Sequence, residues 1–447
     1  MKKMKKITFF IATSLLLLSC ESSVEGLNDN PNQFTDSPLS LILNHSMLNV
    51  ASIAEAEPAR ISGIFTDQFT GVDRQYGTLN GYSTLSTTYE NFWEDIYQRG
   101  VSQIQIAKAK AIDGGNAVAE GQALILEGYH FAEAALVFGD IPFSEVNNSE
   151  FSSPAYEGQS AVIKGAIAMI TDGVAKAGSS SAENNVFETS STWAQVGNAL
   201  KARYYLALGD MTNANASAVA ANFSSEANDW SIIHSTANYG ENLFWQFEVE
   251  QRADYLKMEN SYMAQLLNST DVSYKGNAKT DETARYNYYV AANGLSLNTS
   301  TGGFAAQKAS FPVVSFVEVQ LIIAETATSN SAKLAALNSV RAHNASKFSS
   351  TYDAYVEADF QTGGIANDGH TVADAMKMEI LLEKFCSVIG LPTYQDVLRT
   401  DNFIGVPIKS SNTTMIPQRF IYPSSEEASN ANFPGYVDQF VATPIHN

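Results

Sequence analysis

The stretch AVAEGQALILEGYHFAEAALVF, residues 117–138, is rich in alanine and glycine, with Leu126, Tyr129 and Leu136 among its larger apolar residues. Alanine is the residue that most favours a helix, and Gly139, which follows the stretch, is typical of a helix end. Small residues at helical spacing bring helix axes close together, because few side-chain atoms separate the backbones. The stretch therefore predicts a long helix that packs closely against other helices.

The same helical periodicity recurs along the chain and predicts a mostly α fold. Helices are expected over Leu39–Phe69, Tyr89–Ile112, Gln159–Ala177, Thr192–Leu208, Ser315–Thr328, Ala332–Asn344, Tyr352–Phe360 and Thr371–Ile389. Helices of about twenty residues joined by short loops are typical of tetratricopeptide-type pairs, although no clean 34-residue signature is visible. We therefore expect tetratricopeptide-like helix pairs rather than a regular repeat array.

Two segments lack this periodicity. Residues 224–312 are rich in Asn, Ser, Thr, Gly, Trp and Tyr, and they interrupt a helical scaffold formed by 39–223 and 313–391. Their short apolar pieces predict brief strands or irregular segments, with one helix over Asp254–Leu267. Residues 392–447 carry scattered prolines and are expected to be irregular. Because loops on a rigid scaffold tend to carry function, the 224–312 insert is the predicted ligand-binding part.

The bulk composition indicates a globular protein. Of 447 residues, 45% are hydrophobic and only 17% are charged, which excludes a largely disordered chain. The formal net charge of −20 repels phosphate backbones, so nucleic acid is excluded as a partner. We expect a single domain over residues 39–447, formed by the scaffold, the insert and the C-terminal region.

The N-terminal sequence MKKMKKITFFIATSLLLLSC has a basic start, an apolar run and then Ser19-Cys20. The run is too short to span a bilayer and predicts a lipoprotein signal peptide over residues 1–19, with a lipid on Cys20. The alternative is an ordinary signal peptide with an incidental cysteine. Residues 20–38 are acidic and polar and predict a tether to a membrane anchored by lipid only. Within the tether, Asn28–Asn32 offers oxygen atoms for a structural calcium ion, but without the spacing of a calcium loop, so no cofactor is expected.

The segment FTGVDRQYGTLNGY, residues 69–82, has three glycines and two tyrosines, and it is predicted to be a loop rather than a helix or a strand. Its glycine spacing does not match a phosphate-binding loop. Aromatic rings stack on the apolar faces of sugars, while amide, carboxylate and guanidinium groups bind the hydroxyls. An alternative is that both tyrosines cover the core. The candidate ligand-binding residues in this segment are Asp73, Arg74, Gln75, Tyr76, Asn80 and Tyr82.

The insert supplies the second group of candidates, chosen for the same sugar-binding chemistry. In RYNYYV, strand alternation would not place all three tyrosines on one face, so at least one is expected to be buried. Trp93 and Trp193 lie beside apolar residues at helical spacing and are assigned to the core. The candidate ligand-binding residues of the insert are Trp230, Tyr239, Trp245, Asn287 and Tyr288.

Patterns typical of enzymes are absent from the sequence, including the nucleophile elbow, the zinc-protease motif and the nucleotide-binding glycine loops. Glu379 and Glu383 resemble a glycosidase pair only in their spacing, and we interpret them as a solvated helix face. His130 and Glu133 are interpreted as packing or surface hydrogen-bonding residues, and Cys386 as a buried thiol. We therefore expect no catalytic residues and no metal site.

Several pieces of the chain, taken in order, resemble one family. They are GLNDNPNQFTDSP, DQFTGVDRQYGTLNGYSTLSTTYENFWEDIY, FGDIPFSE, ALKARYYLAL, FPVVSFVEVQLIIAE, EILLEKF and IPQRFIYPSSEEASN. Their order and spacing are similar to those of the SusD/RagB family of Bacteroidetes, in particular its SusD-like branch. The chain departs from the family pattern at Tyr394, where a tryptophan is usual, and at its end, FPGYVDQFVATPIHN.

The resemblance implies a nutrient-binding lipoprotein on the cell-surface side of the outer membrane. It implies that the protein captures a glycan without catalysis and delivers it to a SusC-like TonB-dependent transporter. It also implies that the segment between the first two long helices, where residues 69–82 fall, contributes to the ligand face. Two alternatives remain open, an oligopeptide ligand for the same transporter type and a lipid-anchored glycoside hydrolase.

Overall fold

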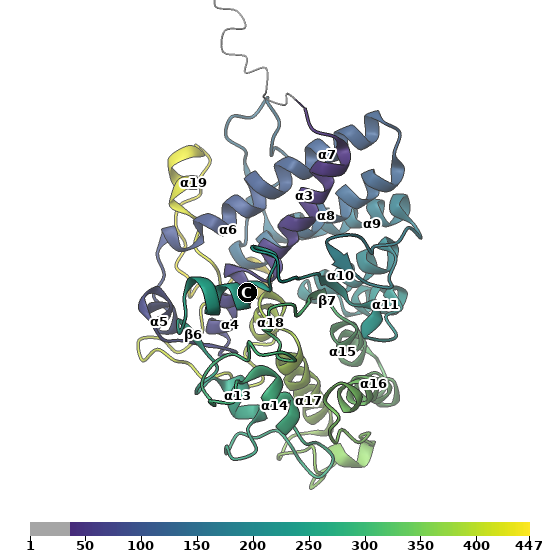
Figure 1. Cartoon of the computed structure of the whole chain (residues 1–447), viewed down its shortest axis with the longest axis vertical. Coiled ribbons are helices and arrows are strands. Elements are labelled where there is room, and N and C mark those ends of the chain that lie inside the picture. Colours follow the sequence, from purple (N-terminus) through teal and green to yellow (C-terminus); the bar gives the residue numbers. More distant parts are fainter. Residues whose placement is uncertain (1–35) are drawn as a thin grey trace, which may run out of the picture. The chain divides into compact units, whose positions relative to one another are not determined.

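Figure 1 shows a computed structural model of the chain, which describes residues 36–447. By internal packing the chain divides into two units, Met1–Leu41 and Ile42–Asn447. The predicted signal peptide, Cys20, the Asn28–Asn32 segment and most of the predicted tether lie outside the described residues. The fold is therefore that of the second unit, which is mostly helical as predicted (labels as in Figure 1).

The first predicted helix is two helices, α3 (Leu39–Ala54) and α4 (Glu57–Phe65). The break falls where Pro58 occupies the first turn of α4, because proline fits a helix start but not a helix interior. After α4 the chain forms the short strand β1 (Thr70–Gly71) and then α5 (Arg74–Asn80). The prediction that residues 69–82 form a loop is therefore wrong for the two residues of β1 and the seven of α5, whose N-terminus is capped by the Asp73 side chain.

The close packing predicted from the alanine-rich stretch is confirmed in α8 (Ala117–Phe138), which pairs with α9 (Gln159–Ala177). A Cβ added to Gly121 would lie 2.4 Å from the backbone nitrogen of Ala177, and one added to Gly128 would lie 2.7 Å from the Ala166 carbonyl oxygen. Only glycine permits these contacts, so the small residues set the distance between the two helices. Preceding α8 are Ser86–Tyr89 (a 3₁₀ turn), α6 (Glu90–Glu94), the π-helical Asp95–Val101 and α7 (Ser102–Asp113).

The remaining scaffold helices pack on this pair and on one another (Figure 1). They are α10 (Trp193–Ala207), α11 (Met211–Ala221), α15 (Phe316–Thr326), α16 (Asn330–Phe348), α17 (Val372–Ser387) and α18 (Leu391–Arg399). The predicted helix Tyr352–Phe360 is wrong, since only Glu357–Phe360 forms a 3₁₀ turn. Helix α18 lies mostly in the region predicted to be irregular, where Pro392 again occupies the first turn of a helix.

The insert contains short helices and strands, and the predicted helix Asp254–Leu267 is reduced to α13. The elements are a 3₁₀ turn (Glu226–Asn228), β5 (Trp230–Ile232), α12 (Leu243–Trp245), a π-helical turn (Gln246–Gln251), β6 (Leu256–Lys257), α13 (Tyr262–Leu267), α14 (Thr283–Tyr289) and β7 (Phe311–Val314). Strands β4 (Phe187–Glu188), β5 and β7 form a three-stranded antiparallel sheet, and β6 pairs with β1. The remaining strands, β2 (Ile141–Pro142) and β3 (Tyr156–Glu157), pair with each other.

The C-terminal region is anchored by buried side chains although it is largely without regular structure. It contains α19 (Ser424–Ser429) and a final 3₁₀ turn, Pro444–His446. Phe420 stacks on Tyr89 at 4.4 Å between ring centroids, and it also contacts Tyr394 and Phe138. The core thus includes residues from both ends of the described chain.

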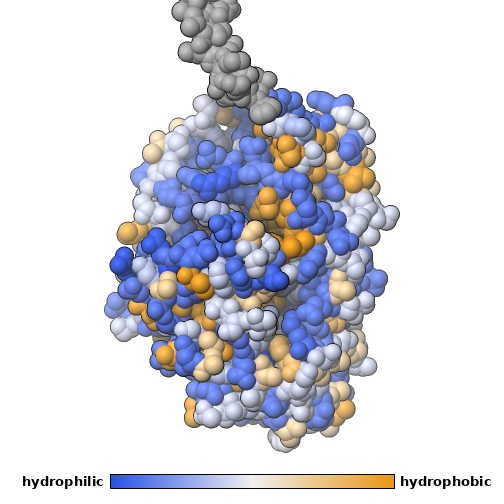
Figure 2. All heavy atoms as spheres, viewed as in Figure 1, coloured by the Kyte–Doolittle hydropathy of each residue, from blue (hydrophilic) through white to orange (hydrophobic). Residues whose placement is uncertain are grey.

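The predicted burial of Trp93, Trp193 and Cys386 is confirmed. On the face in Figure 2, hydrophobic residues form separate patches among hydrophilic ones. Within residues 36–447, none of the helices is long and apolar enough to cross a bilayer.

Candidate functional site

A cleft of about 1150 Å³ lies where the insert meets the scaffold. One wall comes from the β4–β5–β7 sheet and the turn before β5. The other walls come from α12, α14, the loop 299–310, and the C-terminal ends of α16 and α17. A cleft of this size exceeds the usual range for a drug-sized ligand, which is roughly 300–1,000 Å³. It is therefore large enough for several sugar units or a short peptide.

Two of the predicted ligand-binding aromatics, Trp245 and Tyr288, line this cleft and are half-buried. Tyr288 is the last but one residue of α14, and its ring contacts Phe348 at 5.6 Å and Phe304 at 6.4 Å between centroids. Because packing holds this ring, Tyr288 is a rigid aromatic surface rather than a free side chain.

Lys347 and Glu226 form an ion pair between two walls of the cleft. The Lys347 Nζ lies 2.6 Å from Glu226 Oε1 and 5.6 Å from the centroid of the Tyr288 ring. Burial opposes the charged form of Lys347, but Tyr288 and Glu226 raise its pKa above the ordinary value. The ammonium group therefore stays charged and covers part of the Tyr288 ring.

The cleft also holds charged residues that form no direct ion pair with another residue of the described chain. Asp229 accepts a hydrogen bond from the Phe316 backbone nitrogen at 2.5 Å, and its burial raises its pKa to about 7. Glu183, Glu188 and Lys308 line the cleft without an ion pair to any residue of 36–447. The lining therefore presents both signs of charge, with an excess of carboxylate on the sheet side.

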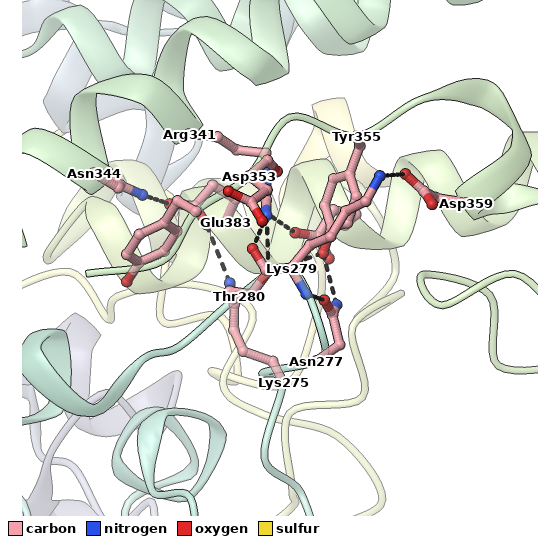
Figure 3. A network of polar contacts seen from close by, with 12 residues as sticks. Lys275, Asn277, Lys279, Thr280, Arg341, Asn344, Asp353, Tyr355, Asp359 and Glu383 are labelled. Carbon is pink, nitrogen blue, oxygen red and sulfur yellow. Dashed lines mark hydrogen bonds and ion pairs between the residues drawn. The ribbon is translucent and has the colours of Figure 1, made fainter.

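The wall formed by α14 rests on a buried ionic network, part of which Figure 3 shows. Arg285, which lines the cleft, lies 3.0 Å from Glu383 Oε1 through Nη1 and donates from Nη2 to Ser387 Oγ at 2.7 Å. Lys275 Nζ donates to Glu282 Oε1 at 2.7 Å and to Glu383 Oε2 at 3.1 Å. Through these contacts the insert is joined to α17, so the position of α14 depends on buried charges.

The same network extends to α16. Asn344 Nδ2 donates to Glu383 Oε1 at 2.8 Å, and Arg341 Nη2 donates to the Lys279 carbonyl oxygen at 2.8 Å (Figure 3). Arg341 also stacks on Tyr355, with its guanidinium carbon 3.7 Å from the ring centroid. Because a buried charge without its partner is strongly destabilising, the network holds three segments in one arrangement.

The interpretation of Glu379 and Glu383 as a solvated helix face is wrong, since both are buried. Although burial alone would raise the pKa of Glu383, Arg285 and Lys275 lower it well below the usual range. Burial raises the pKa of Glu379. Glu133 is likewise buried and accepts hydrogen bonds from Arg203 and Tyr204, consistent with the packing interpretation.

None of the candidate ligand-binding residues of segment 69–82 lines the cleft. Some of them are exposed and the others are buried or half-buried. Asp73, Arg74 and Gln75 are exposed, and Asp73 is 3.9 Å from the Arg74 Nε. Asn80 is half-buried and uses Oδ1 to accept hydrogen bonds from the Gly71 backbone nitrogen and Lys409 Nζ. Asn80 thus has a structural role.

Tyr76 and Tyr82 are each only 2% exposed, so as ligand-stacking residues they are corrected to core residues. The Tyr76 hydroxyl accepts a hydrogen bond from Arg60 Nε at 2.9 Å, and its ring lies 4.8 Å from that of Phe247. The Tyr82 ring contacts Phe65 at 6.0 Å. The alternative that both tyrosines cover the core is the one that the structure supports.

Trp230 is corrected in the same way, because it is fully buried against Phe187 and Trp193. Tyr239 and Asn287 are exposed and outside the cleft lining. The expectation that one tyrosine of RYNYYV is buried is confirmed for Tyr289, although the segment is the helix α14 and not a strand.

Sequence reasoning missed several residues of the cleft, including Glu226, Asp229, Lys347 and the hydroxyl-bearing Thr299 and Thr301. The Ser-, Thr- and Gly-rich run at 299–303 was a local signal for a binding loop. The charged residues had no such signal. Glu226 and Asp229 lie more than a hundred residues before Lys347 in the sequence, and they meet it only in the folded chain. Within residues 36–447, no cluster of three metal-ligating side chains is present.

The chain matches the profile of a SusD-like family described as "Starch-binding associating with outer membrane" over residues 31–423. None of the curated proteins matches the sequence.

Solved structures match across nearly the whole chain. A SusD/RagB family protein from Bacteroides thetaiotaomicron is similar with a TM-score of 0.66, at 19% identity, over 89% of this chain and 95% of that one. A chitin-binding SusD homologue from Flavobacterium johnsoniae is similar with a TM-score of 0.65, at 14% identity, over 91% of this chain and 99% of that one. A SusD homologue from Parabacteroides distasonis is similar with a TM-score of 0.66, at 12% identity, over 92% and 97%.

At these identities the likeness to solved structures shows the fold, and the profile match over most of the chain shows the family. The mostly helical fold agrees with both findings. The chain belongs to the SusD-like family.

Proposed function

We propose that this protein is a non-catalytic binding protein that captures a glycan in the cleft and delivers it to a SusC-like TonB-dependent transporter. Support for the glycan comes from the description of the family as starch-binding and from the chitin-binding SusD homologue of the same fold. The transporter partner follows from the family resemblance. Import would then depend on two proteins, one that binds the nutrient and one that moves it.

The observation that carries the proposal is the combination of Trp245 and Tyr288 with a hydroxyl-bearing loop in one large cleft. Sugar rings present apolar C–H faces and equatorial hydroxyl groups. An aromatic ring binds the first by stacking, and the side chains of Thr299, Thr301 and Ser310 can exchange hydrogen bonds with the second. An apolar ligand would need the aromatic rings but not the row of hydroxyl-bearing side chains.

The second candidate ligand is an oligopeptide, and the charged lining favours it. Carboxylates on the sheet side and Lys308 and Lys347 on the other side fit the two charged ends of a short peptide. A neutral glycan gains less binding free energy from such charges, since its hydroxyl groups interact with them only as dipoles. The two ligand classes therefore differ in the salt dependence of their binding.

We also propose that the mature protein begins at Cys20, carries its lipid there and faces the outside of the outer membrane. The basic start, short apolar run and Ser19-Cys20 support this location, together with the family description as outer-membrane-associated. Labelling of the protein with a radioactive fatty acid, lost in Cys20→Ala, tests it. Incorporation that persists in the variant would contradict it.

Affinity electrophoresis against a panel of soluble polysaccharides, including starch and glycol chitin, tests the ligand. We expect retardation by at least one polysaccharide and its loss in Trp245→Ala. Retardation by none of them, with calorimetric binding of a peptide mixture instead, would replace the glycan by the oligopeptide. Release of shorter sugars from a retarding polysaccharide would contradict the non-catalytic part and support the glycoside hydrolase alternative.

A further inference from the structure

Tyr239 is the most exposed aromatic residue within residues 36–447, with 89% of its surface accessible, and its backbone has a φ of 66°. A left-handed conformation is unfavourable for a bulky residue and persists only where the surrounding structure enforces it. An aromatic ring left almost fully in water gains nothing for stability. The buried Tyr82 has a similar φ of 62°, so it is the exposure of the Tyr239 ring that indicates a contact outside the folded chain.

Two backbone hydrogen bonds close the loop that carries Tyr239, residues 234–242. The Ser235 backbone nitrogen donates to the Gly240 carbonyl oxygen at 2.7 Å, and the Gly240 nitrogen donates to the Ala237 carbonyl oxygen at 2.8 Å. A Cβ on Gly240 would lie 2.7 Å from Ser235 Oγ and 3.1 Å from the Ala237 carbonyl oxygen, so the turn is closely packed at this position.

A single buried carboxylate fixes the two ends of the loop. His234 Nε2 lies 2.8 Å from Glu55 Oε2, and the Leu243 backbone nitrogen donates to Glu55 Oε1 at 2.8 Å. Glu55 itself is fully buried and directly follows the last residue of α3. The scaffold therefore sets the position of the loop through one side chain.

The segments that lead into and out of the loop reach the cleft lining. Ser231, three residues before its start, lines the cleft, and so does Trp245, three residues after its end. Asn242 donates from its backbone nitrogen to the Gln307 carbonyl oxygen at 3.0 Å and from Nδ2 to the Ala309 carbonyl oxygen at 3.0 Å. Both acceptors belong to residues of the cleft wall, so the loop and the cleft are parts of one structure.

We infer that residues 234–242 form a preformed arm whose Tyr239 binds a part of the glycan chain that extends beyond the cleft, and that Glu55 positions this arm. The inference rests on the proposed function and narrows it to ligands longer than the cleft can enclose. A tyrosine side chain has only two χ angles and therefore loses little conformational freedom on stacking, which suits a contact with successive sugar units.

The test compares the wild-type protein with Tyr239→Ala, Glu55→Gln and the control Tyr436→Ala, which removes another exposed tyrosine outside the cleft lining. Each is run against the retarding polysaccharide by affinity electrophoresis and against its disaccharide and hexasaccharide by calorimetry. We expect Tyr239→Ala to lower the affinity for polymer and hexasaccharide about tenfold and to leave disaccharide binding unchanged. Glu55→Gln should give the same pattern more weakly, which loss of stability alone would not produce.

Equal affinity of Tyr239→Ala and wild type for polymer and hexasaccharide would overturn the inference while leaving the cleft as the binding site. Equal loss for long and short ligands would also overturn it, because the contact would then lie within the cleft. If no polysaccharide of the panel retards the wild type, the proposed function fails and the inference fails with it. Loss of transport but not of glycan binding in Tyr239→Ala would assign the arm to a protein partner instead.

Discussion

Two segments rich in aromatic and polar residues, 69–82 and 224–312, have a similar composition, but only the second contributes to the cleft. In the first, Tyr76 and Tyr82 are buried, and Asn80 binds backbone and Lys409. In the second, Trp245 and Tyr288 line an open cleft and Tyr239 is exposed. Composition alone therefore does not separate a structural aromatic from a ligand-binding one.

The difference lies in the residues that approach each segment from elsewhere in the sequence. Arg60 and Phe247 cover Tyr76, whereas Lys409 and Phe440 contact Tyr82. In the insert, the ends of α16 and α17 leave space against the sheet, and the buried ionic network keeps α14 in place beside it. The tyrosines of the first segment are therefore packed in the core. Part of the second segment instead lines an open cleft.

The largest expected effect is on stability, in Tyr76→Ala. Removing a fully packed ring leaves a cavity and leaves Arg60 without its hydroxyl partner, which costs about 3–5 kcal/mol of unfolding free energy. Urea unfolding measures the loss, and polysaccharide retardation of the remaining folded protein should be unchanged. The exposed neighbour in Gln75→Ala is the control, with an expected change within about 0.5 kcal/mol. Loss of retardation in a folded Tyr76→Ala would return segment 69–82 to the ligand site.

Trp245→Ala should show the reverse pattern. A half-buried aromatic ring that stacks on a ligand contributes about 1.4 kcal/mol or more, so glycan affinity should fall tenfold or more in calorimetry. The unfolding free energy should change far less than in Tyr76→Ala, because the ring is already partly in water. The outcome that would place the site elsewhere is unchanged affinity together with a strongly lowered stability.

The third effect is a pH dependence caused by Asp229. With a pKa of about 7 instead of 3.8, the folded protein keeps this proton between pH 4 and 7, where the unfolded chain has lost it. Its contribution to stability is therefore present at low pH and is lost as the pH rises through about 7. Asp229→Asn should flatten the fall in melting temperature between pH 4 and 8, measured by calorimetry at intervals of one pH unit. Identical curves for both proteins would show that Asp229 is not buried in this way.

The smallest effect is expected for Lys347→Ala, which removes the ion pair with Glu226. Pairs exposed to this degree contribute only about 0–1 kcal/mol to stability. Because Lys347 covers part of the Tyr288 ring, its removal should increase the affinity for a neutral glycan by about threefold, or ~0.6 kcal/mol. Lys333→Ala on the same helix is the matched control. A large decrease in affinity would mean that Lys347 binds the ligand directly.

The helical scaffold was predictable because its signals are local. Alanine-rich stretches such as 117–138, with glycine at their ends, give a helix and its limits, and the bounds of α9 agree with the prediction at both ends. The helices that were predicted wrongly also have local causes, but these give only a weak signal in the sequence. Asp73 caps a short helix within a glycine-rich segment, and Pro58 and Pro392 begin helices instead of ending them.

The cleft was predictable only in part, because its residues meet through tertiary contacts. Trp245 and Tyr288 were found from their residue type within a loop-rich insert. Burial of Trp230 follows from the β5 strand that places it against Trp193, which no local pattern indicated. Similarly, Glu383 has the spacing of a solvated helix face but meets Lys275 and Arg285 from the insert about a hundred residues away.

The fluorescence of Trp245 reports directly on whether the glycan binds in the cleft. Of the four tryptophans, Trp93, Trp193 and Trp230 are buried, and only Trp245 is half-exposed. Acrylamide quenching of tryptophan fluorescence, with and without a saturating amount of the retarding polysaccharide, therefore measures access to the cleft. We predict that the polysaccharide protects the quenchable fraction, and that Trp245→Phe abolishes this fraction. A polysaccharide that binds with full affinity while quenching stays unchanged would contradict the assignment of the cleft as the binding site.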